Sequence, residues 1–360
     1  MTVCGHALTA SVEYTPCMSD ESFPASIFDV RPLRFVWFGE SVVSDLGNPA
    51  ATTSRALLRA LGRLGHHAVF LEERGNRPTT ELLRTHGAAP LRAFNREFPD
   101  IAYRTYDLPA GRERFVWLGR ELSVADVVIV QDTTPASVID VIRQGTAPHV
   151  VRVVQLTTER VPPVDADLVV APIGSDAGQP LGPAIWTGNP THPPPKNGVI
   201  VVAYGDLPLA TALAERLAPL APALVSAGPP VTPGIRYVPE ADLRARYADY
   251  AVAIVVGAGG QPLAAARALL PVSAGCVTFV AGDVPSAPST TALGVEPVHE
   301  ETVLERVTHG IEAISQGLTP RVPPQFDAAA QTEQLVSDVH AIKFTARSST
   351  DGVNKDHEQR

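Results

Sequence analysis

Long apolar runs are missing from this 360-residue sequence, and no stretch approaches the roughly 20 apolar residues that a membrane-spanning helix needs. Its first residues also lack a basic flank followed by an apolar core, which is the pattern of a secretory signal. Cysteine is rare, and Cys4, Cys17 and Cys276 have neither metal-site nor redox spacing. We therefore expect a cytoplasmic protein with no membrane span and with no metal or other cofactor.

Lysine and aromatic residues are also scarce. Lys196, Lys343 and Lys355 are the only lysines, and the net charge is −9. A nucleic-acid-binding protein usually presents a basic stripe, so we expect no nucleic-acid partner. With aromatics at 6%, the core must consist mainly of Val, Leu, Ala and Ile, a mixture that suits buried parallel strands flanked by helices. A chain of this length has room for two such cores.

The first half of the sequence alternates between strand and helix patterns. Residues 1–31 lack periodicity and predict an N-terminal extension. The apolar run Leu33–Phe38 predicts a strand, Ala50–Gly65 has leucines at helical spacing, and His67–Glu72 predicts the next strand of a βαβ unit. The alternation predicts a Rossmann-like domain over residues 32–173, with further strands at Ile101–Tyr106, Ala125–Asp132, His149–Leu156 and Ala166–Ile173.

Residues 174–198 are dense in glycine and proline, which predicts a linker. A second alternating series follows over residues 199–325 and predicts a second Rossmann-like domain. The expected fold class is therefore α/β, with two doubly wound domains facing a cleft. A late helix over Phe326–Phe344 precedes a polar tail, residues 345–360, that we expect to be disordered. The helix has an apolar stripe that should pack against the first domain, formed by Leu335, Val339 and Ile342.

Two carboxylates follow strands of the predicted first domain. Glu40 comes after the first strand and Gly39, and Asp132 ends the strand Ala125–Asp132. Ligands of open α/β sheets bind beyond the carboxyl ends of the strands, where a carboxylate can act as a base. Glu40 and Asp132 are therefore the candidate catalytic residues. For Asp132, stabilising the turn and the next helix is the alternative.

Polar residues also gather between the first strand and the first helix. Asn48, Thr52 and Thr53, together with Gly39, could line a ligand site at this sheet edge. The alternative is that Asn48 starts the helix and the threonines lie in its first turn.

The second domain has glycine-rich strand ends that could approach a phosphate. Glycines allow close backbone approach, and a following helix offers unpaired N–H groups and a positive dipole. Close packing of a helix on a sheet would need the same glycines. The candidate phosphate-contacting residues are Gly205, Gly257, Gly259, Gly260, Gln261 and Arg267.

The block Gly47–Glu73, "GNPAATTSRALLRALGRLGHHAVFLEE", resembles the N-terminal block of CgeB-type spore-protein glycosyltransferases. Those proteins have a Gly-Asn-rich loop, an "ATT-x-R-x-LLRAL-x-x-x-GH" helix and a strand ending in acidic residues. The resemblance implies a GT-B-like fold. It places a nucleotide-sugar donor on the second domain and an acceptor on the first, which would make Gly39, Asn48, Thr52 and Thr53 acceptor-side residues.

The sequence departs from that pattern at three positions. Relatives commonly have a histidine where this chain has Ala50. Retaining GT-B enzymes usually carry two glutamates that align with Gly257 and Ala265. This chain therefore lacks the two carboxylates on which the donor chemistry of retaining GT-B enzymes usually depends.

The resemblance leads us to expect a glycosyltransferase that moves a sugar from a nucleotide-sugar to an unknown acceptor. One alternative is a catalytically degenerate GT-B-fold binding or partner protein, which the missing carboxylates favour. A second alternative is a nucleotide-sugar epimerase-like enzyme.

Overall fold

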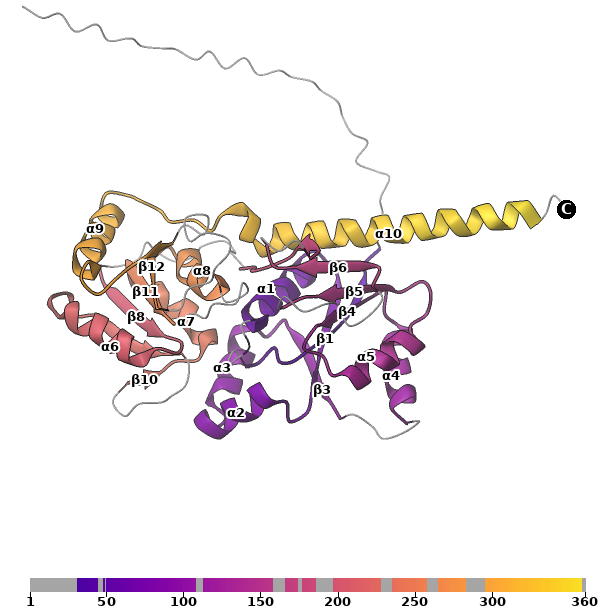
Figure 1. Ribbon diagram of the computed structural model, residues 1–360, viewed down its shortest axis with the longest axis horizontal. Helices are drawn as coiled ribbons and strands as arrows, with labels where there is room; N and C mark the ends of the chain where they lie inside the picture. The colour runs from indigo at the N-terminus through magenta and orange to yellow at the C-terminus, as the bar shows by residue number, and fades with distance from the viewer. Residues whose placement is uncertain are drawn as a thin grey trace, which may run out of the picture. The chain divides into compact units, whose positions relative to one another are not determined.

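The computed structural model describes residues 31–44, 48, 50–107, 113–157, 166–173, 177–185, 197–227, 235–257, 265–282 and 295–357. Within these residues the chain forms two lobes, each built on one parallel sheet with helices packed against it (Figure 1). The two-sheet α/β class expected from the sequence is confirmed.

The first lobe has the strand order β3-β2-β1-β4-β5-β6-β7, and all neighbouring strands are parallel. Its strands are β1 (Arg34–Gly39), β2 (His67–Glu73), β3 (Ala102–Tyr106), β4 (Val127–Gln131), β5 (Val151–Gln155), β6 (Leu168–Ala171) and β7 (Gln179–Pro180). Its helices are α1 (Ala50–Arg63), α2 (Arg77–His86), α3 (Ala89–Glu97), α4 (Glu113–Ser123) and α5 (Ala136–Gly145).

The second lobe repeats this plan in the order β10-β9-β8-β11-β12-β13, again all parallel. Its strands are β8 (Val199–Ala203), β9 (Ala223–Ser226), β10 (Arg236–Tyr237), β11 (Val252–Val256), β12 (Val277–Ala281) and β13 (Glu296–Pro297). Its helices are α6 (Leu207–Arg216), α7 (Glu240–Tyr247), α8 (Ala265–Ser273) and α9 (Val303–Ser315), with the short 3₁₀ turn Ala218–Leu220 after α6.

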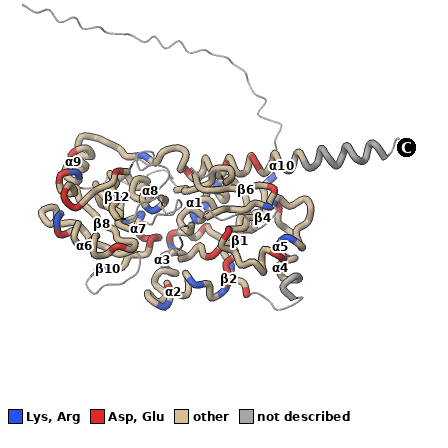
Figure 2. Tube along the Cα trace, in the orientation of Figure 1, with Lys and Arg blue, Asp and Glu red and all other residues tan. Residues whose placement is uncertain are grey.

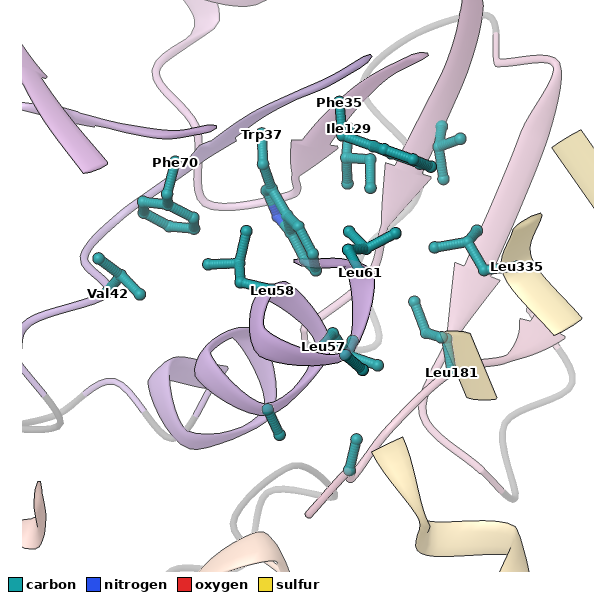
Figure 3. Close-up of a cluster of buried hydrophobic side chains, with 14 of the residues drawn as sticks. Phe35, Trp37, Val42, Leu57, Leu58, Leu61, Phe70, Ile129, Leu181 and Leu335 are labelled. Carbon is teal, nitrogen blue, oxygen red and sulfur yellow. The ribbon is translucent and has the colours of Figure 1, made fainter. Parts of the chain in front are cut away.

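The central strands β1, β4, β8 and β11 are buried on both faces, which explains why they are runs of mostly apolar residues. In β1, Phe35 and Trp37 join the cluster that contains the leucines of α1, whereas Val36 and Phe38 join the cluster on the opposite face. This alternation follows from the two-residue period of a strand. Figure 3 shows Trp37 beside the α1 leucines.

The strand orders place a topological switch point in each sheet. Chain progression reverses between β1 and β4 in the first lobe and between β8 and β11 in the second. A crevice for a ligand is expected at the carboxyl ends of the strands on either side of such a point. A ligand site is therefore expected at the carboxyl ends of the strands, near Gly39 in the first lobe and near Gly205 in the second.

The last helix, α10 (Ala328–His357), packs against α1 of the first lobe. Leu335 and Val339 lie in the same hydrophobic cluster as α1, with Ile342 packed against it. The predicted apolar stripe is thereby confirmed. The start of α10 is also fixed, because the Asp327 carboxylate accepts a hydrogen bond from the backbone N–H of Ala329 at 2.9 Å.

Three elements differ from the sequence-based expectation. Part of the expected linker forms β7, which pairs with β6. Helix α3 was not predicted, although Pro90 near its N-terminus is a favourable helix start. Helix α10 continues through Thr345 to His357, where we expected a disordered tail, because extending an existing helix requires no new nucleation and no proline interrupts it.

The expected N-terminal extension lies, apart from its last residue, outside the described residues, as do Cys4 and Cys17. No described helix is long and apolar enough to cross a membrane. Among the described residues, no group of three or more His, Cys, Asp or Glu side chains could hold a metal ion.

Candidate functional site

The carboxyl edge of the first sheet is held together by buried amides. Gln131, at the end of β4, donates from Nε2 to Ser54 Oγ at 3.0 Å and to Gln155 Oε1 at 3.1 Å. Its Oε1 accepts from the backbone N–H of Glu40 at 3.3 Å. A Cβ on Gly39 would lie 2.3 Å from Gln131 Oε1, so any other residue here would force the Gln131 side chain to move. Gly39 therefore allows the amide network to form.

The loop after β1 is braced by the buried carboxylate of Glu72. Its Oε2 accepts from the backbone N–H of Val42 at 3.0 Å. Burial raises the pKa of Glu72, and hydrogen bonds from Val42, Ser41 and Asn76 oppose that shift. Asn48 donates from Nδ2 to the carbonyl oxygen of Ser41 at 2.8 Å. The predicted ligand-binding residue Asn48 thus helps to fix the loop.

The two candidate catalytic carboxylates both lie at this edge, in different environments. Glu40 is half-buried, and burial raises its pKa while the nearby charge of Arg77 opposes the shift. Asp132 Oδ1 accepts a hydrogen bond from the Thr157 hydroxyl, and its backbone N–H donates to the Gln155 carbonyl at 3.0 Å. Glu40 therefore has a carboxyl with a raised pKa, and Asp132 has a carboxylate that is oriented by a hydroxyl donor.

The two threonines of α1 point to different parts of the molecule. Thr53 Oγ1 accepts from the backbone N–H of Ala184 at 3.2 Å and is fully buried, so its contact is structural. Thr52 donates its hydroxyl proton to Glu240 Oε1, at the start of α7 in the second lobe. Thr52 thus lies where the lobes meet.

Glu240 is the centre of a buried charge cluster between the lobes. Its Oε1 accepts from Arg55 Nη2 at 3.1 Å, and its Oε2 lies 3.9 Å from Arg267 Nε. The Arg267 guanidinium also lies over the Tyr204 ring, 4.8 Å from its centroid. Arg267, predicted to neutralise a phosphate, therefore has a carboxylate neighbour within the protein.

Sequence reasoning did not identify Glu240 as a site residue. It follows Pro239 at the start of a short helix. An acidic residue at such a position ordinarily interacts favourably with the helix dipole and is exposed to solvent. No local pattern signals that it is buried against Arg55, which is 185 positions away in the sequence.

The carboxyl edge of the second sheet brings three glycines together. Gly257 follows β11 with φ +65°, and a Cβ there would lie 2.8 Å from the backbone nitrogen of Asp206. Gly282, which follows β12, has φ +77° and a Cβ position 3.6 Å from the backbone nitrogen of Gly257. Gly205 follows β8, and its Cβ position is 3.6 Å from the Gly257 carbonyl oxygen. The backbone of three strand ends therefore comes close together at the switch point of the sheet, with the side chains of Asp206 and Leu209 beside the glycines.

Asp206 caps the N-terminus of α6 at this edge, because its Oδ1 accepts a hydrogen bond from the backbone N–H of Leu209 at 3.0 Å. The predicted contacts Gly259, Gly260 and Gln261 lie outside the described residues, so they stay predictions.

The structure gives a physical reason for the missing glutamate pair. At Gly257 the positive φ and the contact with Asp206 disfavour any side chain. Ala265 is fully buried in the hydrophobic cluster of the second lobe, where a glutamate would lose its hydration. Both positions are therefore adapted to packing.

Solved structures share this architecture over most of the chain. An α-glucosyltransferase in complex with UDP and a 13-mer DNA containing an HMU base has a TM-score of 0.55 and 8% identity, covering 85% of this chain and 99% of that chain. The same type of enzyme in complex with UDP-glucose and DNA containing an abasic site has a TM-score of 0.54 and 10% identity, covering 85% and 99%. A UDP-GlcNAc 2-epimerase of Methanocaldococcus jannaschii, in complex with UDP-GlcNAc and UDP, has a TM-score of 0.48 and 10% identity, covering 86% and 99%.

No protein-family model matches the chain, and no curated protein matches it in sequence. At these low identities the likeness to solved structures is evidence of the fold alone. The two parallel sheets, each with its switch point, and the likeness to the glycosyltransferases lead to one conclusion: the chain has the GT-B fold.

Proposed function

We propose that this protein is a GT-B-type glycosyltransferase of the kind that the Gly47–Glu73 block resembles, which moves a sugar from a nucleotide-sugar to an acceptor. The observation that carries the proposal is the glycine edge, formed by Gly205, Gly257 and Gly282. It lies at the switch point of the second sheet in a fold whose α-glucosyltransferase representatives were solved with UDP or UDP-glucose.

The glycine edge suits a diphosphate because Gly205, Gly257 and Gly282 place no side chain of their own where the strands end, and the nearby Asp206 carboxylate caps α6. Backbone N–H groups can then approach phosphate oxygens closely, and the protein stabilises the leaving diphosphate electrostatically. Arg267 would contribute a cation near this edge if a ligand's negative charge competed with Glu240 for it.

The acceptor would bind at the edge of the first sheet, where Glu40 and Asp132 lie. A base must take the proton of the acceptor hydroxyl, and a carboxyl with a raised pKa is better matched to that task near neutral pH. We therefore assign the role of base to Glu40 and a role in orienting the acceptor to Asp132. The net charge of −9 favours an acceptor other than nucleic acid.

A second candidate function is binding of a nucleotide-sugar without transfer. It is favoured by Gly257 and Ala265, which leave no room for the carboxylates that retaining enzymes usually carry there. Binding without release of the nucleotide would identify this function.

The test is a thermal-unfolding screen with UDP-, GDP-, dTDP- and ADP-linked sugars. A ligand at 100 times its dissociation constant should stabilise the protein by about 2.7 kcal/mol. Gly205→Asp adds a negative charge at the glycine edge, and Gly205→Asn adds a side chain of the same shape without the charge. Gly205 is exposed and its Cβ position has only one contact at 3.6 Å, so both variants should fold.

We expect the Gly205→Asp variant to bind the nucleotide-sugar at least tenfold more weakly than the Gly205→Asn variant. Equal affinity of the two variants for the nucleotide-sugar would contradict donor binding at the glycine edge. The absence of stabilisation by any nucleotide-sugar would refute the proposed function.

A further inference from the structure

Two buried glutamines end the face of the first sheet that packs against α1. Gln131 ends β4 and Gln155 ends β5, and the two are partners in the strand register. A strand faces the same way every two residues, so they continue the face of Ile129 and Val153, which lie in the hydrophobic cluster of α1. Gln131 and Gln155 are 1% and 0% exposed. A polar layer therefore closes this face at the carboxyl edge of the sheet.

The layer has room for the Gln131 amide because β1 contributes no side chain to it. Gly39 ends β1, and a Cβ there would overlap the Gln131 amide oxygen. The amide occupies this space, and its Oε1 accepts from the backbone N–H of Glu40 at 3.3 Å. Gln131 thus contacts the backbone of the residue to which we assign the role of base.

This contact fixes the direction of the Gln131 amide. A backbone N–H can only donate, so the oxygen of Gln131 has to face Glu40. Its Nε2 is then directed at two acceptors, Ser54 Oγ at 3.0 Å and Gln155 Oε1 at 3.1 Å. Turning the amide over would set Nε2 against the Glu40 N–H and Oε1 against the Gln155 oxygen. Gln131 is therefore held in one orientation.

Gln155 supports this orientation at the expense of its own hydrogen bonding. Its Nε2 is buried and has no hydrogen-bond partner among the described residues. Turning the Gln155 amide over would bring that Nε2 against the Nε2 of Gln131, and two donors would meet. A buried donor without a partner destabilises a fold. The arrangement therefore favours the orientation of Gln131 over the hydrogen bonding of Gln155.

The chain is also fixed on the other side of Glu40. The Glu72 carboxylate accepts from the backbone N–H of Val42 at 3.0 Å, and Val42 is fully buried. With the backbone held at residues 40 and 42, the Glu40 side chain keeps its own torsions to adjust. Titratable side chains at this edge also include Asp132 after β4 and Arg77 of α2, whose arginines are drawn in blue in Figure 2.

We propose that Gln131 is a positioning residue, which sets the place of Glu40 relative to the acceptor hydroxyl by holding the Glu40 backbone N–H. The inference rests on the proposed sugar transfer, in which Glu40 takes the acceptor proton. A base has to lie within hydrogen-bond distance of that proton, and a misplacement of about 1 Å lowers the rate about a hundredfold. Ser54 and Gln155 contribute by orienting Gln131.

The test compares Gln131→Met with Gln331→Met in the full-length protein, since both variants lose a buried amide. Gln331 is the matched control, because it is 7% exposed and bonds the backbone of Gly182 and Pro183 instead of that of Glu40. Hydrogen exchange followed by NMR needs no nucleotide-sugar. The Glu40 amide should exchange about tenfold to a hundredfold faster in Gln131→Met, as expected when a buried N–H loses its acceptor, and at the wild-type rate in Gln331→Met.

Turnover separates positioning from stability. We would measure nucleotide release from the nucleotide-sugar that the unfolding screen selects, with water as the acceptor. Gln131→Met should lower kcat about tenfold to a hundredfold, with KM for the nucleotide-sugar unchanged. Burial raises the pKa of Glu40, so a more hydrated Glu40 should move the acid limb of the kcat profile to lower pH. Glu40→Gln should abolish that limb, and Gln331→Met should leave it in place.

Two further variants test the route through Gln131. Gln131→Glu keeps an oxygen opposite the Glu40 N–H and should retain the slow exchange of that amide. Gln155→Met should cause a smaller change than Gln131→Met, and adding it to Gln131→Met should lower kcat no further, because Gln155 acts through Gln131. Should Gln131→Met fail to fold by near-ultraviolet circular dichroism, Gln155→Met takes its place.

The inference is overturned if the wild type turns over and Glu40 exchange or the acid limb is the same in Gln131→Met as in Gln331→Met. With Gln155→Met in its place, wild-type exchange and a wild-type acid limb overturn it. A wild type that releases nucleotide from none of the nucleotide-sugars refutes the proposed function itself, and the role of Glu40 as base with it.

Discussion

Arg55 of α1 and Glu240 of α7 form an ion pair at 3.1 Å, and both side chains are only 3% exposed. One residue comes from each lobe, so this pair joins the two sheets directly. Removing water from both charges is expensive, and the pair persists because Thr52 and Arg267 also contact the carboxylate.

Glu240→Ala should therefore lower the free energy of unfolding by about 3 to 5 kcal/mol, because it leaves buried guanidiniums without their carboxylate. Asp242→Ala on the same helix is the control, since Asp242 is a partly exposed partner of Arg96 and its loss should cost under about 1 kcal/mol. Urea unfolding of both variants measures the difference. Equal losses of unfolding free energy in the two variants would contradict a large stabilising contribution from the ion pair between Arg55 and Glu240.

Acid should loosen the attachment of α10. Burial lowers the pKa of His66, and the charges of His340 and His67 lower it further. The pKa of His340 is lowered by burial and by Lys343, whereas Asp126 opposes the shift. His66 Nδ1 accepts a hydrogen bond from the backbone N–H of Leu33 at 3.1 Å, and protonation would abolish that acceptor.

The unfolded chain protonates these histidines near pH 6.5, before the folded protein does. Their contribution to stability is thus complete above about pH 6.5 and declines as the pH falls through 6.5 toward the lower folded pKa values. Unfolding free energies measured between pH 7.5 and 5 should decline, at a slope of about one proton per histidine at most. His340→Gln should flatten the decline, and His309→Gln on the exposed face of α9 should not.

Leu335→Ala should destabilise the first lobe by about 2 to 5 kcal/mol, because Leu335 is 2% exposed in the core that α10 shares with α1 (Figure 3). Leu304→Ala on α9 removes the same atoms from a side chain that is 40% exposed, and should change stability by under about 0.5 kcal/mol. Chemical unfolding compares the two. A negligible effect at Leu335 would place α10 outside the cooperative core.

Gly39→Ala should destabilise the protein, because its Cβ would lie 2.3 Å from Gln131 Oε1 and 2.5 Å from the Phe70 ring. Gly62→Ala provides the opposite case, since Gly62 lies in α1 with no atom within 4 Å of its Cβ position. That substitution should stabilise by about 0.5 to 1 kcal/mol. Equal changes in the free energy of unfolding for Gly39→Ala and Gly62→Ala would contradict the close packing of Gly39 against Gln131 and Phe70.

The sequence was most informative where structure depends on local pattern. Strand and helix periods predicted both sheets, and the stripe through Leu335 and Val339 predicted the packing of α10. Strand β7 was missed because Gln179–Pro180 is a two-residue edge strand without an apolar pattern. The ion pair between Arg55 and Glu240 was missed because the burial of Glu240 depends on contacts made across 185 residues of sequence.

The most direct test of the account is hydrogen–deuterium exchange with and without the nucleotide-sugar that stabilises the protein best. Donor binding at the glycine edge predicts slower exchange at residues 203–209 and 252–257, at the ends of β8 and β11, and unchanged exchange in α2. Unchanged exchange in both strand ends at a saturating ligand concentration would contradict the proposed donor site and, with it, the proposal that this protein is a nucleotide-sugar-dependent transferase.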